Sequence, residues 1–447
     1  MNEPDRMLNQ TGPSLARALQ PMSLGRIATP IACLGAALGF IPACGSTLDS
    51  LGCGERHAAD GGSGFNGSVT LTALVSPGSY PNAFRDLLSK SDNDIANKLA
   101  DTFDQLFHGD PTNEAIFVPV GTDQAYISDV LHNEIRTEGI GMGMMVSVEL
   151  DKRDEFDRLW RYAKSTLQVP DGADQGYFRS YCYNGSTDYV CNEPFGLEQF
   201  ATSLLLARGR WQSSPGAIDY GQDASNLLDL IRNKEAYNCG IADGVTGVFD
   251  SESKLVYNTP TATSANTSRP SIVTPAYYDL WQQATGDPFW GQAAAAARNY
   301  WQASANPTTG LIPEEATFDG KSVAGFETFQ PECDRAFFNM ALDHLWSGTQ
   351  GWLVDESNRL LQFFYQQGLT SYGQAYSLDG TSEIVSFHDA ALIAANGTLA
   401  LVASTNRRGD FVNEVWNLTT PTGTSRYYPG IMQLFALVML SGQMRVY

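Results

Sequence analysis

The chain has 447 residues, which is enough for two or three domains or for one large helical barrel. With 49 acidic and 28 basic residues its net charge is -21, so nucleic acids and anionic lipid surfaces are poor partners. Hydrophobic residues make up 43% and charged residues only 17%, which predicts a sizeable core and a surface that suits neutral polar ligands such as sugars.

The first 44 residues have the pattern of an export signal. Arg17 and Arg26 precede an uncharged apolar run at 27–41, which is too short to span a bilayer as a mature helix. The run ends in Ile-Pro-Ala-Cys-Gly, which is similar to the lipobox of bacterial lipoproteins, with Cys44 as the acylated residue. The alternative is an ordinary signal peptide with an incidental cysteine. The lipobox predicts a secreted or cell-envelope protein, anchored by lipid alone and addressed to the outer membrane.

Cysteine and glycine usage after this signal suggests a tether followed by one domain. Residues 45–68 are rich in Gly and Ser and are expected to be a flexible tether, with one domain at 69–447. In an oxidising compartment Cys182 and Cys191, which flank a polar turn, are the pair expected to form a disulfide. No Cys-x-x-Cys motif or His/Cys cluster occurs, so neither a metal site nor a cofactor is expected.

Helix-like segments alternate with loops rich in Gly, Pro and Asn over the rest of the chain. The predicted helices are 83–108, 138–150, 152–167, 197–210, 224–234, 275–284, 288–303, 333–346, 354–367, 388–403, 409–416 and 430–441. Some are amphipathic, whereas others, such as the segment at 390–402, are apolar all round and must be buried on every side. This alternation predicts an all-α fold, an (α/α)6 barrel of two helical layers, with short strands at 68–75 and 247–258.

Glu138 is the first candidate for chemistry. It precedes a Gly-x-Gly-x-Gly-Met-Met run, and Thr137 is expected to cap the helix that begins there. The glycines would let a ligand approach the backbone closely. Desolvation in a cleft would raise the pKa of such a carboxyl, as a general acid requires. The alternative, which spacing alone favours, is that Glu138 only stabilises the positive end of the helix.

Several ordered motifs recur along the chain, and the main one is Arg-Thr-Glu-Gly-x-x-x-Gly-Met-Met at 136–145, followed by Phe-Asp-Arg-Leu-Trp at 156–160. These motifs resemble glycoside hydrolase family 8, and within it the reducing-end xylose-releasing exo-oligoxylanases. Further matches lie at 125–129, 133–136, 275–281, 335–343, 387–388, 426–428 and 434–442, so the resemblance runs from about Ile95 to Tyr447. It implies an (α/α)6 barrel, β-1,4-glycan substrates, and inversion by a Glu acid and an Asp base.

The base position departs from the family pattern. The resemblance places the base three residues before Arg335, where this chain has Glu332 instead of Asp, and Asp334 is close by. The extra methylene of Glu would move the carboxylate by over ~1 Å, enough to disturb a water. Neighbours at i and i+2 of a helix face different ways, so only one of the two is expected in the cleft, and Glu332 is favoured. The alternative for both is a solvated charge at a helix start.

Other candidate sugar contacts combine matches and losses. Phe195 stands where the relatives have an Asp that contacts the sugar at the scissile bond, and Ile272 where they have a Tyr that helps hold the water. Phe195 could stack on a pyranose face. His388 corresponds to a loop His that helps block the cleft beyond the reducing-end sugar, and Arg335 is a further expected contact. Tyr126 is predicted to bind sugar because it lies in the expected loop before the acid.

These features predict a monomeric, cofactor-free hydrolase that cleaves β-1,4 bonds in xylo-oligosaccharides or a related β-glycan with inversion. Glu138 would be the acid, and Glu332 or Asp334 the base. The alternative is a glycan-binding lipoprotein on a decayed scaffold, which the losses at Phe195 and Ile272 would explain. A lyase would need a Tyr/His pair and a group that neutralises a uronate, and the sequence shows no such constellation.

Overall fold

The computed structural model describes residues 80–180, 182–183, 193–212, 218–234, 245–264, 266–348 and 351–447. All of them belong to one unit, residues 52–447. The expected signal, the lipobox with Cys44, the tether and the strand at 68–75 lie outside the described residues, as does Cys191 of the expected disulfide. None of the described helices combines the length and the apolar composition that a bilayer crossing requires.

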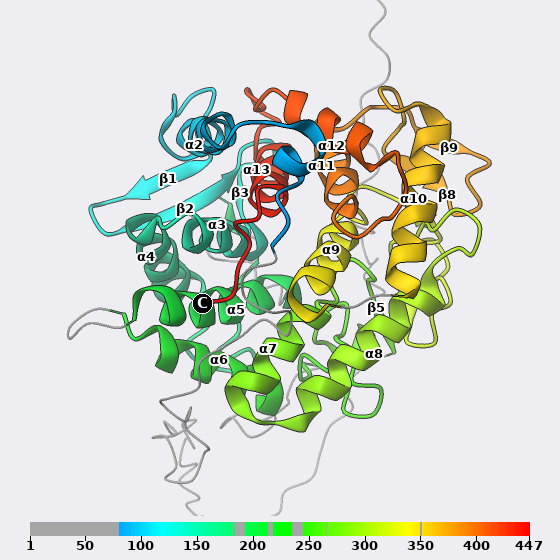
Figure 1. The fold of residues 1–447 in the computed structure, drawn as a ribbon. Coiled ribbons are helices and arrows are strands. Elements are labelled where there is room, and N and C mark those ends of the chain that lie inside the picture. Colours follow the sequence, from blue (N-terminus) through cyan, green and yellow to red (C-terminus); the bar gives the residue numbers. More distant parts are fainter. Residues whose placement is uncertain are drawn as a thin grey trace, which may run out of the picture. The chain divides into compact units, whose positions relative to one another are not determined.

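Six helices that are buried on nearly all sides form a closed inner ring (Figure 1). They are α3 (Thr137–Glu149), α5 (Pro194–Trp211), α7 (Pro275–Thr285), α9 (Arg335–Ser347), α11 (Ala390–Leu399) and α13 (Tyr427–Leu440). Each contacts the next along the chain, and α13 contacts α3. Because these helices have neighbours on every side, most of their residues are apolar or small.

Six more helices alternate with these along the chain and form the outer layer. They are α2 (Asp92–His108), α4 (Arg153–Tyr162), α6 (Tyr220–Asn233), α8 (Pro288–Ser304), α10 (Trp352–Gly368) and α12 (Arg408–Asn417). A short helix, α1 (Ala83–Leu88), packs on α12. The outer helices are amphipathic: in α4, Phe156 and Leu159 are buried while Asp154 is exposed. The predicted all-α class and (α/α)6 barrel are confirmed.

Most predicted helices are confirmed within a few residues, and two differ for local reasons. The segment predicted as 83–108 is divided because Ser89 adopts a left-handed conformation, with φ 55°, and ends α1. The segment predicted as 152–167 changes from α4 to a π-helical turn at Ala163–Leu167. The strand expected at 247–258 is wrong: the structure has there only an isolated bridge between Phe249 and Val256.

Short antiparallel strands, none of which the sequence predicted, lie between the helices. One sheet has the order β1 (Phe117–Val120), β2 (Gln124–Asp129), β3 (Glu134–Ile135) and β4 (Cys182–Tyr183); β5 (Thr267–Ser268) pairs with β6 (Ala316–Thr317); and β7 (Thr328–Phe329), β8 (Ala375–Ser377) and β9 (Glu383–Val385) form the third. The β1–β2 hairpin turns at Gly121, whose φ is 61°. Through β3 the first sheet leads directly into α3.

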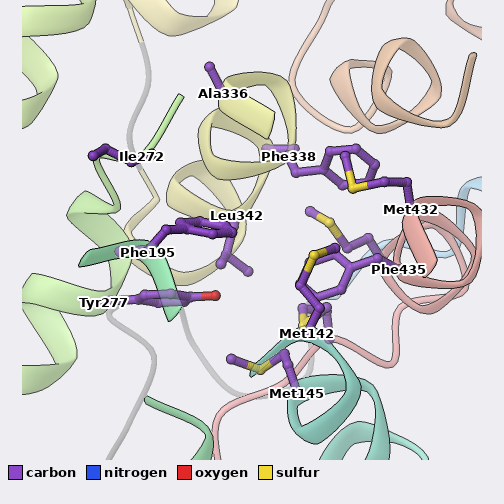
Figure 2. Close-up of a cluster of buried hydrophobic side chains, with 14 of the residues drawn as sticks. Met142, Met145, Phe195, Ile272, Tyr277, Ala336, Phe338, Leu342, Met432 and Phe435 are labelled. Atoms are coloured by element: carbon purple, nitrogen blue, oxygen red, sulfur yellow. The ribbon is translucent and has the colours of Figure 1, made fainter. Parts of the chain in front are cut away.

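The middle of the inner ring is filled by side chains from several helices (Figure 2). Those that meet there are Met142 and Met145 of α3, Phe195 of α5, Tyr277 of α7, Phe338 and Leu342 of α9, and Met432 and Phe435 of α13. Because the barrel is packed at this level, a ligand can be received only at an end of the ring. The N-termini of the inner helices lie at one such end.

The glycines of α3 serve packing, which corrects the expectation that they leave room for a ligand. A Cβ added at Gly139 would lie 2.6 Å from the Tyr427 hydroxyl of α13, and one at Gly141 2.5 Å from Cβ of Gln199 in α5. One at Gly143 would lie 3.0 Å from a side-chain carbon of Ile127 in β2. Protein atoms therefore occupy the space that the glycines leave, and α3 packs with its backbone against three neighbours.

Gly141→Ala is therefore expected to destabilise the fold, by about 1–3 kcal/mol, because the new methyl group must displace Gln199. Urea unfolding followed by circular dichroism measures this change. Gly409→Ala is the matched control, because this helical glycine of α12 has only one atom, 4.0 Å away, near its added Cβ. The control should be neutral or gain up to about 1 kcal/mol. Equal stability of the two variants would contradict the packing role.

Candidate active site

The N-terminal turns of α3, α9 and α13 meet around the carboxylate of Glu138. Glu138 is the second residue of α3, so its predicted position in the first turn of a helix is confirmed. Only 7% of the residue is exposed. The guanidinium of Arg335, the first residue of α9, donates a close hydrogen bond to Oε2 of Glu138. The hydroxyl of Tyr427, the first residue of α13, donates to Oε1 at 3.5 Å. Positive helix ends thus converge on this carboxylate.

The helix start differs from the sequence prediction in its cap. The N-cap residue of α3 is Arg136, whose side chain makes no capping bond, and Thr137 is already helical. The Thr137 hydroxyl donates instead, at 3.5 Å, to Glu193 Oε2 at the start of α5. The expected cap by Thr137 is therefore wrong, because the sequence could not show that a carboxylate 56 residues away competes for the hydroxyl.

Arg335 is a buried cation that joins two carboxylates. Its Nη1 bonds Glu138, and its Nη2 lies 2.7 Å from Glu332 Oε2. Its guanidinium carbon also lies 5.1 Å from the centre of the Phe195 ring, within the range of a cation–π contact. A buried guanidinium is tolerated only where counter-charges and hydrogen bonds replace water. Arg335 thus fixes the relative positions of Glu138 and Glu332.

Glu332 has the properties of a base. It lies in the turn before α9 with φ 76°, a left-handed conformation that non-glycine residues rarely adopt. Its side chain is 38% exposed and also pairs with Arg269, whose Nη1 is 3.4 Å from Oε2. Burial alone would raise the pKa of Glu332, but Arg335 and Arg269 outweigh it and hold the pKa below the usual value. The carboxylate is therefore ionised and open to water.

Asp334 is close by in a different environment. It is only 3% exposed, and the hydroxyl of Tyr428 donates to its Oδ1 at 2.8 Å. Burial raises the pKa of Asp334 to about 7, aided by the nearby charge of Asp389 and opposed by the Tyr428 hydrogen bond. Because α9 begins at Arg335, both acids precede the helix and the expected helical i, i+2 geometry does not apply. Exposure distinguishes them instead.

Two predicted sugar contacts have other surroundings. Phe195 is 3% exposed and points into the packed centre beside Tyr277 and Leu342 (Figure 2). A ring closed off from solvent is not available to stack on a pyranose, so this prediction is wrong. Tyr126 lies on strand β2, not in a loop, and its half-buried ring packs 5.2 Å from that of Tyr162 in α4. These contacts do not support a role for Tyr126 in sugar binding.

The loop before α11 borders the site, with His388 held in place by the protein. Nδ1 of His388 lies 2.8 Å from the carbonyl oxygen of Tyr372, and the two rings meet edge to face with centroids 4.5 Å apart. The preceding residue, Phe387, is 64% exposed, and the following one, Asp389, acts on the pKa of Asp334. The contact between His388 and the sugar stays a prediction. Ile272 is buried.

Sequence reasoning did not single out three residues of the site, Glu193, Tyr427 and Tyr428. Both tyrosines belong to the quoted motif at 426–428, and their hydroxyls contact Glu138 and Asp334 respectively. Glu193 carries only one weak signal, an acidic residue directly before a proline that begins a helix. Among the described residues, no group of His, Cys, Asp and Glu could hold a metal ion.

The chain has relatives among known proteins. The model of the family described as "Glycosyl hydrolases family 8" matches residues 121–442. The chain belongs to glycoside hydrolase family 8. It is 31% identical over 390 residues to the reducing-end xylose-releasing exo-oligoxylanase Rex8A of Paenibacillus barcinonensis, covering 85% of this chain and 100% of that protein. An exo-oligoxylanase of Halalkalibacterium halodurans is 32% identical, over 82% of this chain and 94% of its own length.

Solved structures agree with this assignment. A family 8 enzyme of Teredinibacter turnerae, in complex with xylobiose, aligns with a TM-score of 0.78 at 30% identity, over 82% of this chain and 97% of that one. The resemblance seen in the sequence is thus confirmed. Because the family consists of inverting glycoside hydrolases, the protein is an enzyme of this kind, and the comparisons do not support the non-catalytic alternative.

Arg335→Met should destabilise the fold by roughly 3–5 kcal/mol, because it leaves the buried carboxyl group of Glu138 without its hydrogen-bonded partner. Guanidinium unfolding measures this loss. Arg85→Met is the control, since Arg85 pairs with Asp92 in solvent, with both side chains more than half exposed, and should change stability by less than about 0.5 kcal/mol. In an Arg335→Met/Glu138→Gln double variant part of the loss should return. A single Arg335→Met variant as stable as the control would refute the assigned role.

Proposed function

We propose that the protein hydrolyses β-1,4 bonds of xylo-oligosaccharides with inversion, using Glu138 as general acid and Glu332 as general base. The observation that carries this assignment is the pair of carboxylates bonded to the guanidinium of Arg335, one buried and one open to water. Three relatives named as reducing-end xylose-releasing exo-oligoxylanases, at 31–32% identity, support xylo-oligosaccharides as the substrate. The endoglucanase A of Acetivibrio thermocellus is 26% identical, so β-glucans are the second choice.

The two carboxylates have complementary roles in a single displacement. Glu138 protonates the glycosidic oxygen as its bond to the anomeric carbon breaks, while Glu332 takes a proton from the water that attacks the opposite face. Inverting enzymes keep the two carboxyl groups ~6.5–9.5 Å apart so that this water fits. In this chain the two carboxylates bond different nitrogens of the Arg335 guanidinium, which holds them apart.

Glu332 is a better candidate for the base than Asp334. A base must be ionised and must reach water, and Glu332 is both half-exposed and held ionised by Arg335 and Arg269. Asp334 is buried and accepts the hydroxyl of Tyr428, so it suits a role in orienting Tyr428 beside the site. Because the backbone at position 332 is left-handed, the Glu332 side chain leaves the backbone in a different direction from that of a helical residue.

Three variants test the roles. Glu138→Gln and Glu332→Gln should each lower kcat on xylo-oligosaccharides by on the order of 10²–10⁴, because each removes a proton transfer from the transition state. Asp334→Asn, the matched control, should lose less than about tenfold. Reducing-sugar release gives the rates, and proton NMR of the first product should show the α-anomer. A larger loss in Asp334→Asn than in Glu332→Gln would move the base to Asp334, and glycan binding without any hydrolysis would favour a binding protein.

We also propose that the protein is exported and anchored in the cell envelope through a lipid on Cys44. The apolar run at 27–41 and the cysteine that follows it support this proposal. A bacterial host fed labelled palmitate should incorporate label into the wild-type protein and into Cys33→Ser, but not into Cys44→Ser. Label that persists in Cys44→Ser would contradict lipidation at Cys44 and would favour an ordinary signal peptide. A cell-envelope location fits a hydrolase of external glycans.

A further inference from the structure

The two oxygens of the Glu332 carboxylate have different surroundings. Nη2 of Arg335 lies 2.7 Å from Oε2, and Nη1 of Arg269 lies 3.4 Å from the same atom. Within the part of the chain that the structure describes, no group donates a hydrogen bond to Oε1. A base takes up a proton through a free lone pair, so Oε1 is the atom of Glu332 that is available to water.

Arg269 itself is held by a fixed stretch of backbone between β5 and α7. On one side of it, the carbonyl of Ser268 accepts the hydroxyl of Tyr300 at 2.8 Å. On the other side, the carbonyl of Pro270 accepts the indole N–H of Trp301, also at 2.8 Å. Both donors belong to α8 and are buried. The guanidinium of Arg269 therefore extends from backbone that the outer layer holds in place.

Two donors on one oxygen restrict the direction of the carboxylate, whereas one donor does not. Arg335 begins α9 three residues after Glu332 and also bonds Glu138. With this donor alone, a side chain that is 38% exposed could turn about its single hydrogen bond. Arg269 adds a second donor from a segment 63 residues away in the chain. Its other terminal nitrogen lies 3.8 Å from Glu314 Oε1, which steadies the guanidinium.

Two of the basic groups around the Glu332 carboxylate are in direct contact with it. The titratable groups nearby are Arg335, Arg269, Arg136 and His132 among the basic ones, Glu314 and Asp334 among the acidic ones, and the neutral Cys333 and Tyr428. Nε of Arg136 and Nδ1 of His132 instead lie 3.2 and 2.8 Å from the carboxylate of Asp129. Burial would raise the pKa of Glu332, but the two arginines in contact with it outweigh this effect and lower the pKa.

We propose that Arg269 is a positioning residue for the general base, which holds Oε2 of Glu332 so that Oε1 meets the attacking water. This inference rests on the function proposed above. In the reaction the water oxygen forms a bond to the anomeric carbon, and one of the water protons passes to Oε1. The bond to the leaving oxygen breaks, and that oxygen takes the proton of Glu138. Solvent then removes the proton from Glu332 and returns one to Glu138, while Arg269 keeps its own protons.

Arg269→Met tests the proposal through the kinetics of xylo-oligosaccharide hydrolysis. The loss of one anchor should lower kcat at neutral pH roughly 10- to 100-fold, because the base is misplaced. The loss of one charge should also raise the pKa of the base, so the acidic limb of the kcat/KM profile should move up by about one pH unit. Arg269→Lys keeps the charge but has a single donor atom, so it should restore the limb and only part of kcat.

Arg232→Met is the matched control. Arg232 pairs with Asp287 at 3.1 Å, and both side chains are exposed to a similar extent as those of Arg269 and Glu332. Its substitution should leave kcat and the pH profile unchanged. An equal loss for Arg269→Met at every pH would show a purely structural role and overturn the proposal.

Thermal unfolding gives a second readout that does not depend on hydrolysis. Because the folded protein lowers the pKa of Glu332 below its ordinary value of 4.5, the pair contributes stability above that pH, which is lost as pH falls through the lower value. Arg269→Met should therefore lower Tm by about 1–2 °C at pH 7 but little at pH 3, and less in a Glu332→Gln background. If this coupling is found without hydrolysis, the function proposed above fails and the contact remains. Hydrolysis without the coupling and without the pH shift refutes the positioning role.

Discussion

A buried guanidinium must have counter-charges within hydrogen-bonding distance, and the end of this barrel is built around that requirement. Arg335 begins α9, and its partners come from the start of α3, the start of α5 and the turn before α9 itself. Three inner helices, α3, α5 and α9, thus contribute their N-terminal turns, where unpaired N–H groups and the helix dipole also favour negative charge. The packed centre of the ring lies below these groups.

The same arrangement gives two glutamates different surroundings, which suit the two roles proposed for them. Glu138 is enclosed by Arg335 and Tyr427, whereas Glu332 is half-exposed and has a second arginine. An enclosed carboxyl can carry a proton to a substrate, and an exposed, ionised one can take a proton from water. Identical side chains therefore differ through burial and through the number of cations nearby. The residue type alone does not reveal this difference.

Local periodicity was sufficient for the fold, because each helix carries its own pattern of burial. Twelve alternating segments and a helix start at Glu138 could be predicted from neighbouring residues in the sequence. The site could be predicted only in part, since its groups are fixed by contacts between distant segments. The burial of Phe195, the competition of Glu193 for Thr137, and the filling of the space beside Gly141 each depend on packing between α3 and α5. The β1–β2 hairpin was missed because its short strands lack a clear alternation.

The backbone at Glu332 carries a consequence for engineering. A left-handed conformation costs a residue with a long side chain of order 1–3 kcal/mol, whereas glycine adopts it freely. Designs that select for thermal tolerance alone would therefore exchange this glutamate for glycine and remove the only carboxylate of the site that is open to water and held ionised. At position 332, in the turn before α9, stability and the proposed catalytic role therefore favour different residues. Gains in robustness should be sought in the outer helices instead.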